Sequence, residues 1–487
     1  IIIFKMGIPY YFHTLTKLYP KILLSTLPKN IDIFSIDFNG CIHPVANSVN
    51  IDKNGNINEI LDSLWTKTED LIKVVSPKKV CICADGVAPL AKIVQQRKRR
   101  YMSSLQKQID GTTNKWNTNA ITPGTSFMKS LDKYMYNKCE KYIYKGSDIN
   151  GEGEHKIFNY ISTETNKNIV IHGMDADLIL ISLINKSSNN IYLMREQNDD
   201  KTIILDINEL YTAIITEMIE KFGIHKETDL IESYCVLCSL LGNDFIPHLM
   251  TVGLKNNGHS RLMKHFHEGY KTYGLLVQDG KINKDLLSFF FQELSKDETD
   301  LLMKETRRYI LSKPIYENKI DQFAKSLINN NDCLVSNWKK KYYKYAFDIN
   351  ETNEIKTVAH KYLDGIYWTY NYYKYQKIDH KWYYPYNTCP TIIDIYNNIN
   401  THNYSANEQG NFLSNDAQLL IVTPKASIDI LDSKLQTFMV DDKKELTYMY
   451  PIEYQIIRFL KKHLWECVPI LPIIDIEHVN SCLQEYL

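Results

Sequence analysis

Residues 170–184, VIHGMDADLILISLI, place two carboxylates in a run that is otherwise almost entirely apolar. Asp175 and Asp177 lie between an expected strand over 168–173 and an expected helix over 178–184. Ionised carboxylates enter an apolar interior only when a cation or hydrogen-bond donors compensate for the lost water. The simpler explanation is helix capping, with Asp175 as the N-cap residue. The alternative is a shared site with other acids, which the rest of the chain must support.

Length and composition limit the classes of protein to be considered. A chain of 487 residues can bury a large core and divide into two or more lobes. Lysine plus arginine equals aspartate plus glutamate at 57 each, so contact with a polyanion requires a local basic patch. No apolar run approaches the roughly 18 residues of a membrane span, and no signal-peptide pattern is present. Ten irregularly spaced cysteines indicate reduced thiols, so we expect a cytoplasmic protein, with a nuclear or virion-associated location as the alternatives.

Hydrophobic runs alternate with helical patterns through the first half of the chain. Five runs read as strands: IDIFSID, KKVCICAD, KYIYKG, NIVIHG and NIYLMRE. This alternation predicts an α/β fold with a mostly parallel central sheet flanked by helices. From about Glu227 onward the pattern becomes largely helical, which predicts a helical second region packed on the sheet. Cys235 and Cys238 have C-x-x-C spacing, but their apolar helical surroundings favour packing over metal binding.

Seven acids share one context, at the ends of apolar runs. They are Asp37, Asp85, Glu152, Glu154, Asp175, Asp177 and Asp244. Each alone could be a turn former or a cap, but seven together favour a single function. Ligands of open α/β sheets gather at the carboxyl ends of the strands, where these acids would meet. Hydrolysis of a phosphodiester by two Mg²⁺ ions requires such a set of oxygen ligands, because Mg²⁺ prefers carboxylates and water.

Six motifs in this order carry a resemblance to a known family: MGIPYYFHTL, DFNGCIH, DGVAPLAKIVQQRKRR, GEGEHKI, MDADLI and GNDFIPHL. WYYPYNTCP, YPIEYQI and WECVPILPIID extend it nearly to the end of the chain. The chain resembles the XRN family of 5′-to-3′ exoribonucleases, in a minimal form such as a virus or a compact eukaryotic genome would encode. The resemblance implies a nuclease core like that of the PIN and flap-endonuclease proteins within 1–275. It also implies that a mainly helical region, 276–487, completes the RNA-binding pocket.

The resemblance further implies an activity. The enzyme would degrade single-stranded RNA processively from a 5′-monophosphate, releasing mononucleotides. All seven acids would be catalytic and would bind two Mg²⁺ ions, for which Mn²⁺ could substitute. The expected partners are the RNA itself and the decapping or transcription machinery, with no membrane.

The basic stretch AKIVQQRKRRYMSSLQKQ follows Asp85 closely. Lys92, Gln96, Arg99 and Arg100 lie at i, i+4, i+7 and i+8, which places them on one face of an expected helix. Such a face could hold a terminal phosphate, whereas a solvated basic helix or a localisation signal is the alternative. The resemblance implies that these four residues form a pocket for the 5′-monophosphate.

Base stacking is the second substrate contact that the resemblance implies. His43 matches the family's histidine that stacks on the first base, and stacking tolerates any sequence. Trp382 is the other candidate platform. The family's Trp-x-Trp pattern is here His380, Lys381 and Trp382, so the second aromatic stays open.

Two other functions compete with this prediction. A flap-type endonuclease would use the same acids, but TVGLKNNGHS matches its DNA-binding turn only faintly. An inactive RNA-binding scaffold would have no need for buried like charges, which repel one another without a metal.

Overall fold

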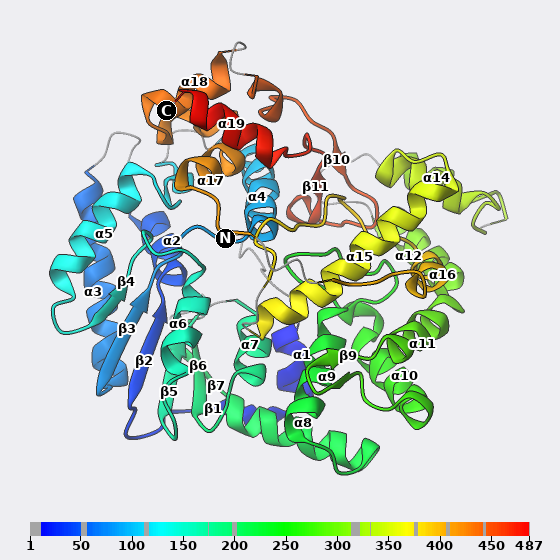
Figure 1. The fold of residues 1–487 in the computed structure, drawn as a ribbon, viewed down its shortest axis with the longest axis horizontal. Helices are drawn as coiled ribbons and strands as arrows, with labels where there is room; N and C mark the ends of the chain where they lie inside the picture. Colours follow the sequence, from blue (N-terminus) through cyan, green and yellow to red (C-terminus); the bar gives the residue numbers. More distant parts are fainter. Residues whose placement is uncertain are drawn as a thin grey trace.

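A seven-stranded sheet in the order β1-β7-β6-β5-β2-β3-β4 forms the centre of the first half of the chain (Figure 1). The strands are β1 (Leu23–Leu24), β2 (Ile33–Asp37), β3 (Lys79–Cys83), β4 (Ile143–Lys145), β5 (Asn168–His172), β6 (Asn190–Glu196) and β7 (Thr202–Asp206). The computed structural model describes residues 11–49, 56–111, 116–173, 175–196, 202–312, 322–331, 333–374, 378–405, 410–441 and 445–486. Residues 6–10 of the first motif and Met174 lie outside the described residues.

The sheet is mostly parallel, as the sequence predicts. β2 lies between β3 and β5, and it is parallel to both, with Ile36 opposite Ile82 and His172. The pairs β3–β4 and β5–β6 are also parallel. Only β7 and β1, at one edge, run antiparallel to their neighbours. The carboxyl ends of five parallel strands, β2 to β6, therefore lie at one edge of the sheet.

Helices cover both faces of this sheet because its strands are apolar on both sides. Phe34, Ile36 and Ile82 belong to one hydrophobic cluster, together with α2 (Asn39–Ser48), α3 (Ile57–Val75) and α5 (Ser126–Lys138). Ile33 and Ile169 belong to the cluster on the other face. That face is covered by α1 (Tyr11–Leu18), α6 (Gly153–Ile161), α7 (Leu178–Ile184), α8 (Ile207–Phe222) and α9 (Glu227–Ser239). Alternation of side chains along each strand produces this two-sided core.

The second half of the described chain is mainly helical, as expected. Its helices are α10 (Gly258–Tyr273), α11 (Lys284–Ser295), α12 (Glu298–Ser312), α13 (Gln322–Ser326), α14 (Trp338–Phe347), α15 (Thr352–Tyr373), α16 (Ile392–Ile399), α17 (Asn415–Val422), α18 (Ser433–Val440) and α19 (Ile476–Tyr486). Two-residue strands pair as β8 (Val277–Gln278) with β9 (Lys281–Ile282) and as β10 (Ile456–Ile457) with β11 (Val468–Pro469). In Figure 1, α15 (yellow) crosses towards α7, and it contacts α7 and α9.

Helix α4 (Leu90–Ile109) connects the sheet with the C-terminal segments. It contacts α17 and β11, and the amide of Leu90 donates to the His380 carbonyl at 2.8 Å. The guanidinium of Arg97 donates to the carbonyls of Met449 and Pro472, at 2.6 and 2.8 Å. The irregular segment 378–390 therefore packs on α4, where the Tyr386 carbonyl also accepts from Lys98 at 3.2 Å.

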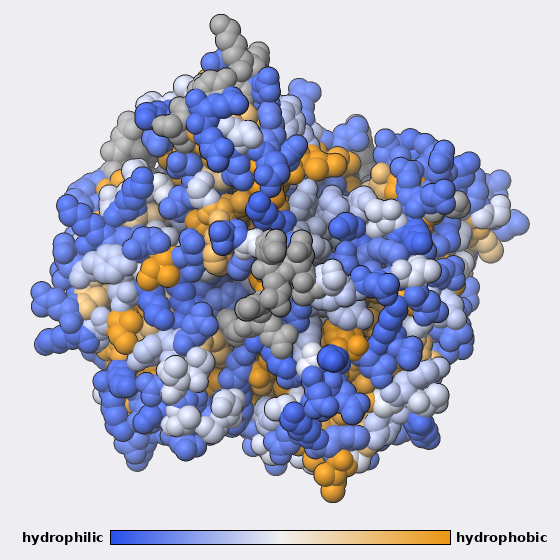
Figure 2. Space-filling view, in the orientation of Figure 1, coloured by the Kyte–Doolittle hydropathy of each residue, from blue (hydrophilic) through white to orange (hydrophobic). Residues whose placement is uncertain are grey.

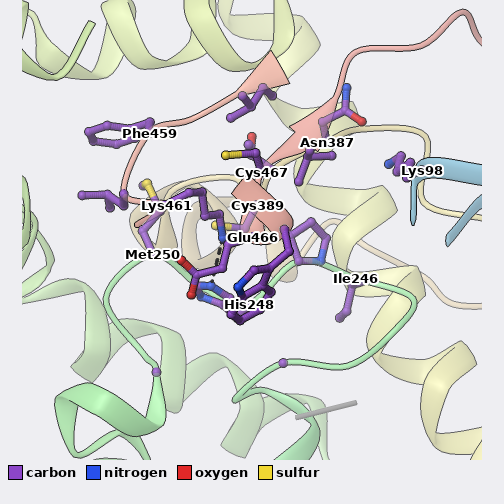
Figure 3. A pocket seen from close by; sticks show the side chains of 18 of the residues that line it. Lys98, Ile246, His248, Met250, Asn387, Cys389, Phe459, Lys461, Glu466 and Cys467 are labelled. Atoms are coloured by element: carbon purple, nitrogen blue, oxygen red, sulfur yellow. Dashed lines mark hydrogen bonds between the residues drawn. The ribbon is translucent and has the colours of Figure 1, made fainter. Parts of the chain in front are cut away.

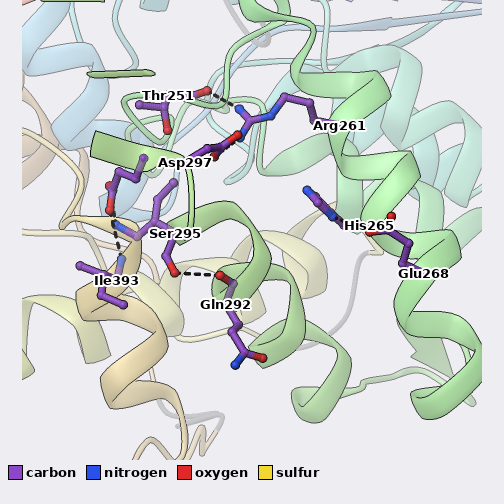
Figure 4. Close-up of polar contacts among 10 residues, drawn as sticks. Thr251, Arg261, His265, Glu268, Gln292, Ser295, Asp297 and Ile393 are labelled. Carbon is purple, nitrogen blue, oxygen red and sulfur yellow. Dashed lines mark hydrogen bonds and ion pairs between the residues drawn. The ribbon is translucent and has the colours of Figure 1, made fainter. Parts of the chain in front are cut away.

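Charged side chains join the loops and helices that follow α9 (Figure 4). Arg261 donates to the Thr251 carbonyl at 2.8 Å and to both carboxylate oxygens of Asp297, at 2.7 and 2.9 Å. The carboxylate of Glu298, the first residue of α12, accepts the amides of Ile392 and Ile393 at the start of α16. The Arg261 bond ties the loop that carries Asp244 to α10, and the Glu298 bonds tie α12 to α16.

Hydrophilic residues cover most of the face shown in Figure 2, and the hydrophobic residues there form small separate groups. None of the helices in the described part of the chain is long and apolar enough to cross a membrane. Cys235 and Cys238 are buried in α9 as free thiols, and burial raises the pKa of both. The prediction that this pair packs in a helix is confirmed.

Candidate active site

The seven acids are delivered by the ends of the parallel strands and by three loops. Asp37 ends β2, and Asp85 lies two residues beyond β3. Glu152 and Glu154 lie at the start of α6, which follows β4. The remaining acids are Asp175 and Asp177, between β5 and α7, and Asp244, in the loop after α9.

Gly153 brings the first three of these segments together. Its amide donates to Asp85 Oδ1 at 2.7 Å. A Cβ atom at this position would lie 2.9 Å from Asp37 Oδ1 and 2.8 Å from the Cys83 carbonyl oxygen. Those distances are shorter than a carbon atom tolerates, so only glycine lets α6 begin so close to the strand ends.

Lys92 holds the cluster together from α4. Its Nζ lies 2.7 Å from Glu152 Oε2 and 3.0 Å from Asp244 Oδ2. All three side chains are buried, which makes this a bridged ion pair screened from water. Lys92 was expected in the phosphate pocket; in this structure its ammonium lies among the carboxylates.

Burial and mutual repulsion perturb the carboxylates strongly. Burial, followed by the Asp244 charge, raises the pKa of Asp177 well above its ordinary value. Burial, followed by Asp177, does the same to the pKa of Glu154. The pKa of Asp37 is likewise raised by burial and by Asp85, and burial raises the pKa of Asp175 to about 6. Such repulsion shows that the acids, far apart in sequence, lie within electrostatic reach of one another.

These donors have the chemistry that Mg²⁺ requires. The acids of the cluster are carboxylates, and Asp177 Oδ1 is buried without a hydrogen-bond partner. In the described part of the chain, no group of three or more His, Cys, Asp or Glu side chains is positioned to hold a metal ion. In this structure the cation between Glu152 and Asp244 is the Lys92 ammonium. Because Mg²⁺ keeps several waters, widely spaced carboxylates still fit it.

The capping explanation for Asp175 is wrong. The residue at the N-cap of α7 is Asp177, not Asp175, and its side chain makes no capping hydrogen bond. Helix α7 thus begins two residues later than a cap at Asp175 requires. Burial of Asp177 is compensated by nearby Lys92 rather than by the helix amides.

Two tyrosines that sequence reasoning missed complete the cluster. The Tyr372 hydroxyl, in the last turn of α15, donates to Glu152 Oε1, and its ring meets the His155 ring edge-on at 4.0 Å. Tyr373 is buried near Asp177, Asp244 and Glu154, and its hydroxyl has no hydrogen-bond partner. No motif singled them out among 34 tyrosines, and the sequence carries no signal for them because only tertiary packing brings the end of α15 to the acids.

The basic face of α4 continues from the acids towards His43. Arg100 is only 7% exposed, and its Nη1 is buried without a hydrogen-bond partner. Burial and the neighbouring Arg99 lower the pKa of Arg100 to about 9. Burial, then the charges of Arg99 and Arg100, lower the pKa of His43 to about 3, so His43 lies within electrostatic range of both arginines. Gln96 is half-buried on the same helix.

Trp382 lies elsewhere, in the packing around α15. Its ring stacks on Trp368 with centroids 5.1 Å apart, and it fills the space above Gly365. His380, at the first position of the family's Trp-x-Trp pattern, packs against Phe412 with ring centroids 4.0 Å apart. The role of Trp382 as a base-stacking platform stays a prediction.

Comparison with known families decides the identity of the chain. Residues 6–197 match the family model described as the XRN 5′-3′ exonuclease N-terminus, and residues 225–337 and 333–486 match the one described as the Xrn1 helical domain. The chain belongs to the XRN 5′-3′ exonuclease family. The resemblance inferred from the motifs is therefore confirmed.

Relatives of this XRN chain include longer proteins. It is 26% identical to 5′-3′ exoribonuclease 1 of Homo sapiens over 98% of its own length and 34% of that protein. It is 22% identical to 5′-3′ exoribonuclease 1 of Saccharomyces cerevisiae, over 99% of its own length and 43% of that protein. It is 23% identical to the 5′-3′ exoribonuclease 2 homolog of Drosophila melanogaster, over 99% of its own length and 71% of that protein. The chain thus spans less than half of the first two relatives.

Two solved structures resemble parts of the XRN chain. The catalytic core of Rad2 in complex with DNA substrate has a TM-score of 0.34 at 14% identity, over 71% of this chain and 89% of that one. The T5 D15 protein co-crystallized with metal ions has a TM-score of 0.29 at 10% identity, over 55% of this chain and 86% of that one. Both scores are below 0.5, and the fold assignment rests on the strands and helices of the XRN chain itself.

Proposed function

We propose that this chain hydrolyses single-stranded RNA processively in the 5′-to-3′ direction, starting from a 5′-monophosphate and releasing mononucleotides. The observation that carries this proposal is the position of α4. The helix presents Lys92 to the acid cluster at one end and the buried Arg100 two turns further along, with His43 within electrostatic range of Arg99 and Arg100. A substrate end held by the arginines would lie next to the carboxylates.

The carboxylates would hold two Mg²⁺ ions, or Mn²⁺ in their place. Asp37, Asp85, Glu152, Glu154, Asp175, Asp177 and Asp244 are the proposed ligands. When bound, Mg²⁺ would supply charge stabilisation to the attacking and leaving oxygens of an in-line displacement. Three of the acids are held in place by hydrogen bonds or ion pairs. Gly153 binds Asp85, Tyr372 binds Glu152, and Lys92 binds both Glu152 and Asp244.

The protein's own cations would select the substrate end. Arg99 and Arg100 would donate to the terminal phosphate, and Gln96 would add an amide donor. His43, held neutral by its low pKa, would offer a flat ring to the first base. A buried guanidinium whose Nη1 has no hydrogen-bond partner favours a phosphate dianion over a hydroxyl. An enzyme that removes caps or triphosphates would then be the partner that supplies substrate.

The test offers 3′-labelled single-stranded RNA with a 5′-monophosphate, a 5′-hydroxyl or a 5′-cap, in Mg²⁺ or in EDTA. We expect rapid loss of the monophosphorylated RNA only, and only with Mg²⁺. Asp177→Asn should abolish cleavage while RNA binding persists, and Arg99→Ala should mainly remove the end preference. Equal degradation of all three ends, or degradation in EDTA, would contradict the proposal.

A flap DNA substrate in the same assay distinguishes the competing endonuclease function. Faster cleavage of the flap than of single-stranded RNA would favour a structure-specific endonuclease. Absence of any cleavage, combined with tight RNA binding, would favour a scaffold.

A further inference from the structure

A cavity of about 860 Å³ lies against the flank of α4 next to the proposed phosphate pocket. Its walls are α4, residues 241–250, residues 383–389 and residues 457–469. Figure 3 shows Lys98 on one side of this cavity and Phe459 on the other. Asp244 and Arg99 also line it, so the cavity adjoins both the acid cluster and the basic face. We call it the α4 cavity. Its volume is within the range of roughly 300–1,000 Å³ that is typical of small-molecule sites.

Lys98 gives the α4 cavity a positive charge without a protein counterion. Its Nζ donates to the Tyr386 carbonyl at 3.2 Å, and among the described residues no carboxylate pairs with it. Burial, followed by the Arg97 charge, lowers the pKa of Lys98 to about 8. An ammonium with unmet hydrogen-bonding capacity on a cavity wall favours an anionic ligand.

The acids on the walls of the α4 cavity already bind donors of the protein itself. Glu466 accepts the backbone amides of Lys462 and His463 at 2.9 and 3.0 Å, and Glu305 pairs with Arg308 at 2.9 Å. Asp244 pairs with Lys92. On the opposite wall, Lys461 Nζ lies 3.4 Å from His248 Nε2, so a second cation faces the space (Figure 3). The net field of the cavity is therefore positive.

The walls also offer flat rings and an amide. Trp465 stacks on His463 with centroids 5.5 Å apart and an angle of 13°, and Tyr386 also lines the cavity. Gln95 Oε1 on α4 is buried without a hydrogen-bond partner, which leaves an acceptor for an exocyclic amine or a hydroxyl. Cations combined with aromatic faces are the features that bind nucleotides.

We propose that the α4 cavity binds a nucleoside 5′-monophosphate, with the phosphate at Lys98 and the base against the aromatic side chains of the 457–469 wall. The proposal rests on the proposed function, because that reaction releases one such nucleotide per step. The released nucleotide leaves the acid cluster past Asp244 and Arg99, and the α4 cavity receives it away from the incoming RNA end. Product bound there slows the next step without competing with RNA.

The test uses the full chain and direct calorimetric binding, so it does not depend on RNA cleavage. Adenosine 5′-monophosphate, adenosine and inorganic phosphate are titrated into the Asp177→Asn variant, which prevents turnover. We expect the monophosphate to bind more tightly than either fragment. Lys98→Gln should weaken its binding roughly tenfold, the effect of one charge-assisted hydrogen bond. Lys107→Gln, on the same helix but outside the cavity, should leave binding unchanged.

Two variants distinguish binding in the α4 cavity from binding in the proposed 5′-phosphate pocket. If Arg100→Gln abolishes binding of adenosine 5′-monophosphate while Lys98→Gln does not alter it, the nucleotide occupies the other pocket and the proposal is overturned. Absence of binding at millimolar concentration also overturns it. In an active preparation, added monophosphate should lower the rate at saturating RNA, and Lys98→Gln should relieve that inhibition. Binding without any RNA cleavage would keep the cavity site and reject the proposed exoribonuclease function.

Discussion

The hydroxyl of Tyr372 in α15 donates to one oxygen of Glu152, and Lys92 Nζ binds the other oxygen at 2.7 Å. The helical region thereby contacts a carboxylate at the start of α6, 220 residues away in the chain. Glu152 has both oxygens occupied by donors from different elements, so its orientation is set before any metal or RNA arrives.

Replacing Tyr372 with phenylalanine should therefore loosen Glu152 without unfolding the protein. We expect a loss of about 1 kcal/mol of stability and a higher Mg²⁺ concentration for half-maximal cleavage. Tyr370→Phe is the matched control, because Tyr370 donates to Glu232 at 2.5 Å, outside the seven proposed ligands. Equal Mg²⁺ titrations for Tyr372→Phe and the unmodified chain would show that Glu152 needs no such support.

Lys92→Met removes the cation that compensates the buried acids. Breaking such a buried ion pair costs about 3–5 kcal/mol, and we expect this loss in urea unfolding with EDTA. Added Mg²⁺ should recover part of it by binding the same carboxylates. Lys339→Met provides the comparison, since Lys339 Nζ pairs with Asp394 Oδ1 at 2.7 Å and Asp394 is not among the proposed ligands, so its loss should not respond to Mg²⁺. An undiminished stability of Lys92→Met in EDTA would refute this assignment.

Arg100 should select the substrate end without stabilising the fold. Its buried Nη1 has no hydrogen-bond partner, so Arg100→Gln should keep or raise the melting temperature. The same change should reduce the preference for 5′-monophosphate over 5′-hydroxyl RNA by roughly tenfold or more. Arg97→Gln should lower the melting temperature and leave the preference for the RNA end unchanged, because Arg97 binds two backbone carbonyls. Competition between differently labelled RNAs measures the preference.

His43 should act as a neutral ring at every working pH. Its pKa of about 3 in the folded protein means that it gains no proton between pH 5 and 8. We expect His43→Phe to keep the KM for RNA and His43→Ala to raise it about tenfold, within the range of one stacking contact. Because this pKa lies below the ordinary value of 6.5, the stability linked to His43 is lost as the pH falls below 6.5. A KM that rises sharply from pH 7 to pH 5.5 in the unmodified chain, but not in His43→Phe, would contradict a neutral ring.

Glu298 gives the stability of the helical region a distinct pH dependence. Burial raises its pKa from 4.5 to about 7, although it accepts two amides of α16. A raised acid pKa favours the folded state at low pH, so this contribution is complete below pH 4.5 and is lost as the pH rises through 7. Relative to Glu298→Gln, the unmodified chain should lose up to about 3 kcal/mol between pH 4.5 and 8. Urea unfolding at several pH values measures this difference, and parallel curves for both proteins would refute it.

The strands and the acids could be predicted because each signal is local. Asp37 and Asp85 follow buried runs, and parallel strands necessarily bring such positions to one edge. β1 was missed because an edge strand of two residues carries almost no hydrophobic pattern. β7, with the apolar sequence TIILD, lies inside the sheet between β1 and β6 and was overlooked. The N-cap was misplaced because capping residues and metal ligands are the same residue type. Tyr372 could not be predicted, since only tertiary packing brings α15 to Glu152. The division at residue 275 and the metal ligands remain predictions.

Arg97 has a consequence for the order in which the protein becomes functional during its synthesis. The bonds of Arg97 to Met449 and Pro472 anchor the middle of α4 to residues that the ribosome adds more than 350 positions later. Until those residues emerge, α4 has no C-terminal support, and its arginines are not yet fixed beside the acids. A nascent chain of this kind would be harmless to the messenger RNA from which it is being translated.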